Sequence, residues 1–211
     1  MTANATCVVI PMKAPRDAKQ RLRPALLDED RCELALALFD RTLVFLRQYF
    51  PALTVLVVTV STGVARLATQ AGAQVLMEQQ PQGLNQALRA ATAWTLQNGF
   101  ARQLILPADI GQLQASEVAF LLSRLTGNGV AIAVAKDLGT NALLSQPPNA
   151  IEFCFGTDSA LQHQVQAQLN NLECHMLHLT HLSQDIDIPE DLPNLERLMY
   201  QHIRGVATYV R

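Results

Sequence analysis

Short apolar runs alternate with longer segments of helical periodicity over the first 135 residues. The apolar runs are uninterrupted, as in strands that are buried on both faces. The predicted strands cover residues 7–11, 53–60, 74–77, 103–106 and 130–135. The predicted helices cover residues 30–49, 61–71, 84–97 and 115–125, with Asp28 or Asp30 as the cap of the first. This alternation predicts an α/β protein with a mostly parallel sheet and helices on both faces.

The pattern changes after residue 135. The next segment is irregular and contains Pro147-Pro148. A helix near 158–169, a strand near 174–179 and a final helix from Pro189 are predicted beyond it. Asp158 or Ser159 could cap the helix near 158–169, and Ser159 could equally be a ligand-binding residue.

Composition narrows the class of protein. The 211 residues are 49% hydrophobic and 16% charged, which excludes a disordered chain. The net charge of −2 argues against a protein that coats nucleic acid. No apolar run approaches the roughly 18 residues of a membrane span, and the N-terminus does not resemble a signal peptide. We therefore expect a cytoplasmic protein without nucleic-acid or membrane partners, and the oligomeric state stays open between a monomer and a homodimer.

A cluster of cations follows the first predicted strand. Five cations and one acid lie between Lys13 and Arg23, in a chain that has few charges elsewhere. Ligands of parallel sheets bind beyond the carboxyl ends of the strands, which is where this cluster lies. A solvated loop is the alternative interpretation, but the cluster favours a clamp for a polyanion such as a polyphosphate. Neither a P-loop nor a Rossmann glycine motif is present to bind it.

Two acidic elements lie at other predicted loops. Asp109 directly follows the strand that ends in Leu-Ile-Leu-Pro, and Asp185 and Asp187 alternate before Pro189. Asp109 alone could form a turn, and the segment around Pro189 could simply begin a helix. Carboxylates that converge beside a cation-lined pocket would instead suit Mg²⁺, which takes few protein oxygens and leaves room for phosphate.

Six short motifs occur together in this chain. They are P-x-K-x-x-x-x-A-K-x-R-L (11–22), G-L-N-x-A-L (83–88), L-P-A-D-I (106–110), G-T-N-A-L-L (139–144), F-G-x-x-S-x-x-x-H (155–163) and D-I-D-x-P-E-D-L (185–192). In this order they resemble the 2-phospho-L-lactate guanylyltransferase family, also called CofC or FbiD. The resemblance implies one GT-A-like (Rossmann-like) nucleotidyltransferase domain over residues 1–211, with a nucleotide-binding half (1–135) and an acceptor-binding half (136–211).

The resemblance also implies an activity and a site. The reaction is transfer of GMP from GTP to 2-phospho-L-lactate, phosphoenolpyruvate or 3-phospho-D-glycerate, with release of pyrophosphate, in coenzyme F-420 biosynthesis. The implied nucleotide-binding residues are Pro11, Met12, Lys13, Lys19, Asn85 and Pro107. The implied catalytic residues are Lys13, Lys19 and Arg21, and the acceptor-binding residues are Thr140, Gly156 and Ser159. The implied Mg²⁺ ligands are Asp109 and Asp187, with Asp185 as a weaker candidate.

The sequence departs from the family pattern at three places. Gly111 stands where relatives commonly have proline, Ile188 replaces a threonine, and Leu138 precedes Gly139 where many relatives have a longer G-T-G-T-N loop. None of these is an implied metal ligand, so we expect activity and leave the acceptor open. The alternatives are another GT-A-like transferase (a sugar-phosphate or molybdopterin nucleotidyltransferase, or a glycosyltransferase) and a nucleotide-binding module without turnover.

Overall fold

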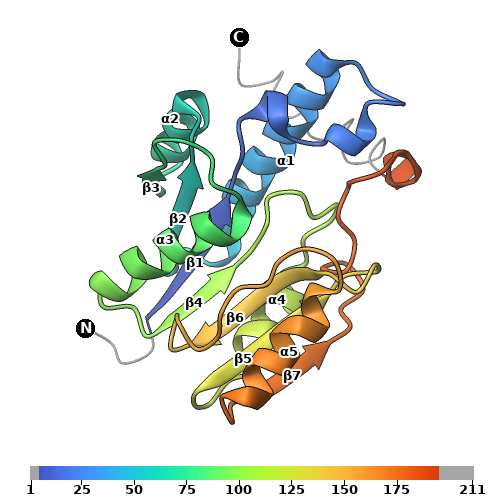
Figure 1. Ribbon diagram of the computed structural model, residues 1–211. Helices are drawn as coiled ribbons and strands as arrows, with labels where there is room; N and C mark the ends of the chain where they lie inside the picture. The colour runs from blue at the N-terminus through green and yellow to red at the C-terminus, as the bar shows by residue number, and fades with distance from the viewer. Residues whose placement is uncertain (1–4, 195–211) are drawn as a thin grey trace.

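The computed structural model describes residues 5–194, and their strands form one seven-stranded sheet of order β3-β2-β1-β4-β6-β5-β7 (Figure 1). The strands are β1 (Thr6–Pro11), β2 (Thr54–Thr59), β3 (Gln74–Met77), β4 (Arg102–Ile105), β5 (Gly129–Val134), β6 (Thr140–Gln146) and β7 (Glu173–Leu177). The α-helices are α1 (Asp28–Tyr49), α2 (Thr62–Gln70), α3 (Leu84–Gln97), α4 (Ala115–Leu122) and α5 (Ser159–Leu169). Three 3₁₀ helices, η1 (Pro15–Asp17), η2 (Gln20–Leu22) and η3 (Pro189–Asn194), flank the site described below.

The core lies on both faces of this sheet, as uninterrupted apolar strands require. In β1, Val8 and Ile10 pack on one face with side chains of α1, α2 and α4. Cys7 and Val9 point to the opposite face and pack with side chains of α3 and α5. Figure 1 shows α3 and α5 together on one face of the sheet. The prediction of a mostly parallel sheet covered by helices on both sides is therefore confirmed.

Strand β6 was not predicted, and the interpretation of this segment as irregular is wrong. It runs antiparallel to both of its neighbours, β4 and β5, and pairs Leu144 with Leu104 and with Ala131. The segment carries polar Thr140 and Asn141 at its start and ends just before Pro147, which masks its strand character. Both polar residues are nevertheless buried, because their side chains bond to other parts of the site.

The predicted cap of α1 is wrong, whereas the predicted cap of α5 is correct in position but makes no side-chain bond. Leu27 is the cap residue of α1, and the carboxylate of Asp28 accepts a hydrogen bond from Arg31 instead. At α5, Asp158 is the N-cap residue, as predicted, but it adopts a left-handed conformation (φ 52°) and its side chain makes no cap bond. Ser159 is the first helical residue, and its hydroxyl donates to Thr140. Beyond η3, the predicted final helix lies outside the described residues.

The proposed division at residue 135 falls within a hairpin, because β5 and β6 pair across it. Strands from both halves thus share one sheet, and the assignment of separate binding roles to the two halves stays a prediction. Among residues 5–194, no helix has both the length and the apolarity that crossing a membrane requires.

Candidate functional site

A cavity of about 600 Å³ opens at the carboxyl ends of β1 to β4, where ligands of parallel sheets bind. Five of the six implied nucleotide-binding residues line it: Pro11, Met12, Lys13, Lys19 and Pro107. Arg21, Asp109 and Asp187 line it as well. The structure therefore brings the cationic loop and two of the predicted carboxylates to one cavity.

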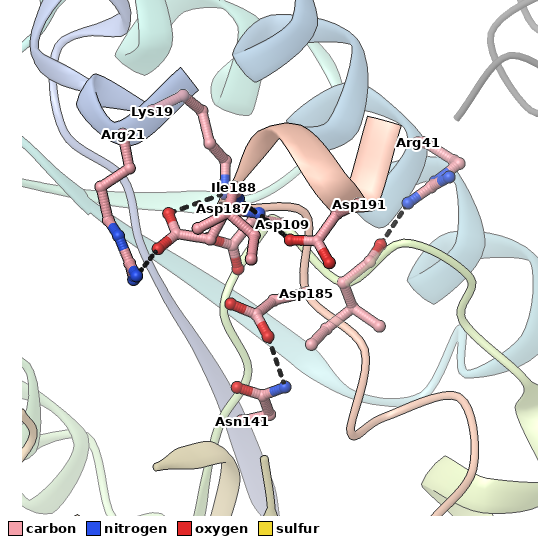
Figure 2. A network of polar contacts seen from close by, with 10 residues as sticks. Lys19, Arg21, Arg41, Asp109, Asn141, Asp185, Asp187, Ile188 and Asp191 are labelled. Carbon is pink, nitrogen blue, oxygen red and sulfur yellow. Dashed lines mark hydrogen bonds and ion pairs between the residues drawn. The ribbon is translucent and has the colours of Figure 1, made fainter. Parts of the chain in front are cut away.

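Lys19 joins the two carboxylates. Its Nζ atom lies 2.7 Å from Oδ2 of Asp109 and 4.0 Å from Oδ1 of Asp187. The Lys19 side chain is only 5% exposed, so its ammonium needs these negative partners to offset the water that it has lost. Arg21 approaches Asp187 from the same loop, with Nη1 2.8 Å from Oδ2 (Figure 2). Asp109 and Asp187, which lie about 90 and 170 positions after Lys19 in the sequence, thus both approach its ammonium.

The loop that carries Lys19 is held in place by a buried arginine. Lys19 lies between η1 and η2 with φ 53°, a left-handed conformation that non-glycine residues rarely adopt. Arg31 of α1 is fully buried, and its Nη1 donates to the carbonyl of Ala18, the preceding residue, at 2.6 Å. The second guanidinium nitrogen donates to Asp28 at 2.6 Å. Packing of α1 therefore fixes the backbone that presents the ammonium.

Asp185 is the third carboxylate at this site, and Figure 2 shows it beside Asp109 and Asp187. Its Oδ1 accepts a hydrogen bond from Nδ2 of Asn141 at 3.2 Å. Burial, and then the negative charge of Asp109, raise the pKa of Asp185 above its ordinary value. Additional positive charge would therefore be favourable here.

The chemistry of these side chains fits a divalent cation. Carboxylate oxygens are the ligands that Mg²⁺ prefers, and it needs only one or two from the protein when phosphate supplies others. Within residues 5–194, no group of three or more His, Cys, Asp or Glu side chains is arranged to hold a metal ion. Lys19 lies between Asp109 and Asp187, so a cation shared by both carboxylates would have to replace its ammonium.

Backbone hydrogen bonds join the loop after β4 to the segment that carries Asp185 and Asp187. Ile110 and Asp185 form an antiparallel bridge, and the N–H of Ile186 donates to the carbonyl of Asp109 at 3.0 Å. The N–H of Gly111 donates to the carbonyl of Gln184 at 2.7 Å. The family pattern commonly has proline at position 111, and proline has no N–H to donate. The glycine of this chain therefore supplies a hydrogen bond that proline could not.

Two residues that the sequence analysis missed support these loops. Arg41 of α1 donates to the carbonyls of Ile110 and Gly111, the latter at 2.7 Å. Glu117 of α4 accepts hydrogen bonds from the backbone N–H groups of His181 and Leu182. Both residues lie on helices, outside every recognised motif, so no sequence signal could have identified them.

Glu117 also shows how the site segment is held electrostatically. Burial opposes ionisation of its carboxyl group, but the hydrogen bonds from Leu182 and His181 hold the pKa below its ordinary value. A charged carboxylate at the start of α4 is favourably placed for the helix dipole as well. The turn that precedes Asp185 is thereby fixed to α4.

The implied acceptor-binding residues form a second, buried cluster. Nε2 of His163 accepts a hydrogen bond from the N–H of Cys154 at 2.9 Å, so the ring proton is on Nδ1. Nδ1 therefore donates to Oγ1 of Thr140 at 3.0 Å, and Ser159 donates to the same oxygen at 3.2 Å. Burial lowers the pKa of His163 to about 4, which keeps the ring neutral. Gly156, at φ 142°, begins the turn that leads to Ser159.

Asn85 does not line the cavity but joins the two regions. Its side-chain amide donates to the carbonyl of Phe155 at 3.1 Å and accepts from the N–H of Phe155 at 2.9 Å. This pair of bonds ties the first turn of α3 to the loop that carries Gly156. A direct contact between Asn85 and a nucleotide stays a prediction.

Comparison with known proteins identifies the same family as the sequence motifs. A family model described as "Guanylyl transferase CofC like" matches residues 6–210. A 3-phospho-D-glycerate guanylyltransferase from Colwellia psychrerythraea is 45% identical over 92% of this chain and 92% of its own length. A phosphoenolpyruvate guanylyltransferase from Sphaerobacter thermophilus is 36% identical over 90% of this chain and 92% of its own.

Solved structures share the fold at low sequence identity. A protein described as a nucleotide-diphospho-sugar transferase, from Desulfovibrio desulfuricans, aligns with a TM-score of 0.74 at 16% identity, over 97% of this chain and 96% of its own. A 4-diphosphocytidyl-2C-methyl-D-erythritol synthase aligns with a TM-score of 0.66 at 14% identity, over 93% and 99% of the two chains. These likenesses confirm the GT-A-like fold of nucleotidyltransferases.

We predict that Arg41→Met destabilises the protein by about 1–3 kcal/mol, because two buried carbonyls lose their donor. Urea unfolding at pH 7 measures this change. Arg47→Met is the matched control, since Arg47 lies on the same helix but is exposed, and its effect should stay within about 0.5 kcal/mol. Equal changes for the two variants would show that the bonds to Ile110 and Gly111 are not stabilising.

A second prediction concerns acid stability. Because the pKa of His163 is about 4 in the folded state, below its value of 6.5 when unfolded, the unfolded state binds more protons between these limits. The stabilisation from neutral His163 is present above pH 6.5 and is lost as the pH falls toward 4. We expect it to decrease by about 2 kcal/mol between pH 7 and pH 5.

Urea unfolding of wild type and His163→Gln at both pH values measures this loss. The stability difference between them should shrink by that amount at pH 5. His178→Gln is the control, because His178 is exposed, and it should follow wild type at both pH values. If the free energy of unfolding of wild type exceeds that of His163→Gln by the same amount at both pH values, the prediction is contradicted.

Proposed function

This chain belongs to the CofC-like guanylyltransferase family, and on that premise we propose that it transfers GMP from GTP to 3-phospho-D-glycerate and releases pyrophosphate. The observation that carries this proposal is the meeting of Asp109 and Asp187 over Lys19 at a cavity of about 600 Å³. The acceptor follows the Colwellia relative at 45% identity, with phosphoenolpyruvate and 2-phospho-L-lactate as the alternatives. The product would enter coenzyme F-420 biosynthesis.

Asp109 and Asp187 are the residues that would hold a divalent cation such as Mg²⁺, with Asp185 as the weaker candidate. When bound, such an ion offsets the negative charge of the phosphate oxygens. A divalent cation held by these carboxylates would repel the positively charged ammonium of Lys19. Lys19 would then leave the carboxylates and bind phosphate oxygens instead.

The loop cations would stabilise the charge that develops on the leaving group. Lys13, Lys19 and Arg21 all line the cavity, and ammonium and guanidinium groups bind phosphate oxygens well. A phosphate oxygen of the acceptor attacks the α-phosphorus of GTP, and the bond to the β-phosphate oxygen breaks. The acceptor phosphate is already largely ionised at neutral pH, so the chain needs to supply positioning and charge rather than a base.

Thr140, Gly156 and Ser159 would bind the acceptor. The Thr140 hydroxyl oxygen already accepts two hydrogen bonds, from Ser159 and from His163, so its own proton is the one left to donate. The neighbouring Asn141 bonds to Asp185, which connects this cluster with the carboxylates at the cavity. Acceptor and nucleotide would thus be held by adjoining parts of one hydrogen-bonded structure.

We predict that Asp187→Ala lowers the rate of pyrophosphate release from GTP and 3-phospho-D-glycerate by about 100-fold or more, because a charge-stabilising group is lost. A coupled pyrophosphate assay measures the rate. Asp30→Ala removes an exposed carboxylate from α1 and should leave the rate near that of wild type. Full activity of Asp187→Ala would remove this residue from the mechanism.

The acceptor can be tested by competition. With GTP and equal concentrations of the three acids, we expect the 3-phospho-D-glycerate adduct to be the major product in mass spectrometry. A dominant adduct of phosphoenolpyruvate or 2-phospho-L-lactate would reassign the acceptor within the family. If none of the acids releases pyrophosphate, the assignment as a guanylyltransferase is wrong for this chain.

A further inference from the structure

Glu78 places a carboxylate in the nucleotide cavity at the end opposite the aspartates. It directly follows β3, and its N–H donates to the carbonyl of Thr59 at 3.0 Å, which extends the pairing of β3 with β2. The residue therefore sits at the carboxyl edge of the sheet and lines the cavity of about 600 Å³. Nearby parts of the lining are apolar: Val58, Val60, Pro81, Leu84 and Ala87.

The Glu78 carboxylate has no hydrogen-bond or ion-pair partner among the described residues, although it is half-buried. Burial raises the pKa of Glu78 above its ordinary value. A partly desolvated carboxylate without a donor is less favourable than one that is fully in water. A ligand that brings hydrogen-bond donors to this end of the cavity would remove that cost.

The position of Glu78 suits the base of a nucleotide rather than its phosphates. The sheet order β3-β2-β1-β4 places Glu78 three strand spacings from the loop after β4, where Asp109 lies. At about 4.8 Å per strand, this separation is roughly 14 Å. An extended nucleoside triphosphate spans such a distance when its phosphates lie at Lys19 and Asp109 and its base lies between the apolar side chains near Glu78.

We propose that the Glu78 carboxylate selects guanine by accepting hydrogen bonds from N1–H and from the 2-amino group of the base. This inference rests on the proposed function and names the residue that would give it nucleotide specificity. Guanine is the only common base that presents two adjacent donors on its Watson–Crick edge. Adenine and cytosine present one amino donor beside a ring-nitrogen acceptor, and uracil presents one N–H between two carbonyls. The two oxygens of a carboxylate, both acceptors, therefore match guanine alone.

The test is Glu78→Gln, which keeps the shape of the side chain but turns one acceptor into a donor. The glutamine oxygen can still accept from N1–H, whereas its amide N–H₂ now faces the 2-amino group of guanine. Xanthine carries a 2-oxo group at that position and complements the amide. We expect kcat/KM for GTP to fall about 100-fold, the effect of losing a hydrogen bond to a charged group, and XTP to become the better substrate. KM for the acceptor should not change.

Calorimetric titration of GTP and XTP against both proteins gives a readout that does not depend on turnover. Glu29→Gln is the control, since Glu29 is an exposed residue of α1, and it should keep the wild-type preference for GTP. Unchanged preference for GTP over XTP in Glu78→Gln would overturn the proposal. If that variant does not fold, wild type with ITP, which lacks the 2-amino group, still tests it: we expect about tenfold weaker binding than GTP, and equal binding overturns the proposal.

The two possible failures can be told apart. If wild type releases no pyrophosphate from GTP with any of the three acids, the proposed function fails while the binding titration still reports on Glu78. If wild type is active with GTP and Glu78→Gln keeps the same preference, the function stands and the role of Glu78 is wrong.

Discussion

The contact between the Lys19 ammonium and the carboxylates of Asp109 and Asp187 sets the requirements for the rest of the site. A cation that is almost fully buried is stable only with negative partners at close range, and here they come from distant parts of the chain. The loop before η2, the turn after β4 and the segment before η3 must therefore be fixed relative to one another. Arg31, Arg41 and the backbone bridge between Ile110 and Asp185 provide this fixation.

The same contact accounts for how one site could hold both a metal ion and a polyphosphate. Three carboxylates face one buried ammonium and one exposed guanidinium, so the site is short of positive charge. A divalent cation would supply that charge, and the displaced Lys19 would be beside the phosphates. Under the proposed function, nucleotide and metal ion would therefore bind more favourably together than either would alone.

The charged groups and the apolar part of the cavity lie at different strands of the sheet. The loops after β1 and β4 carry the charged groups, whereas the end of β3 provides an apolar region with a single carboxylate. In β6, Thr140 bonds to the buried His163 and Asn141 bonds to Asp185, so the neutral ring orients a hydroxyl without adding charge near the carboxylates. Under the proposed function, the groups that contact phosphate, base and acceptor would thus lie at different strands of one sheet.

The sequence by itself determined the strands and helices of the first 135 residues and the motifs that meet at the site, because these depend on periodicity and on residue type at short range. The sequence could not identify β6, because the polar residues at its start are typical of a loop. Their burial depends on hydrogen-bond partners that lie far away in the sequence. At the helix starts, Asp28 bonds to Arg31 within α1 instead of capping it, and Ser159 bonds across to Thr140 of β6, so neither hydroxyl nor carboxylate acts as a cap. Only the tertiary structure placed Lys19 between two carboxylates and revealed Arg41, Glu117 and Glu78, because their roles depend on which distant groups they face.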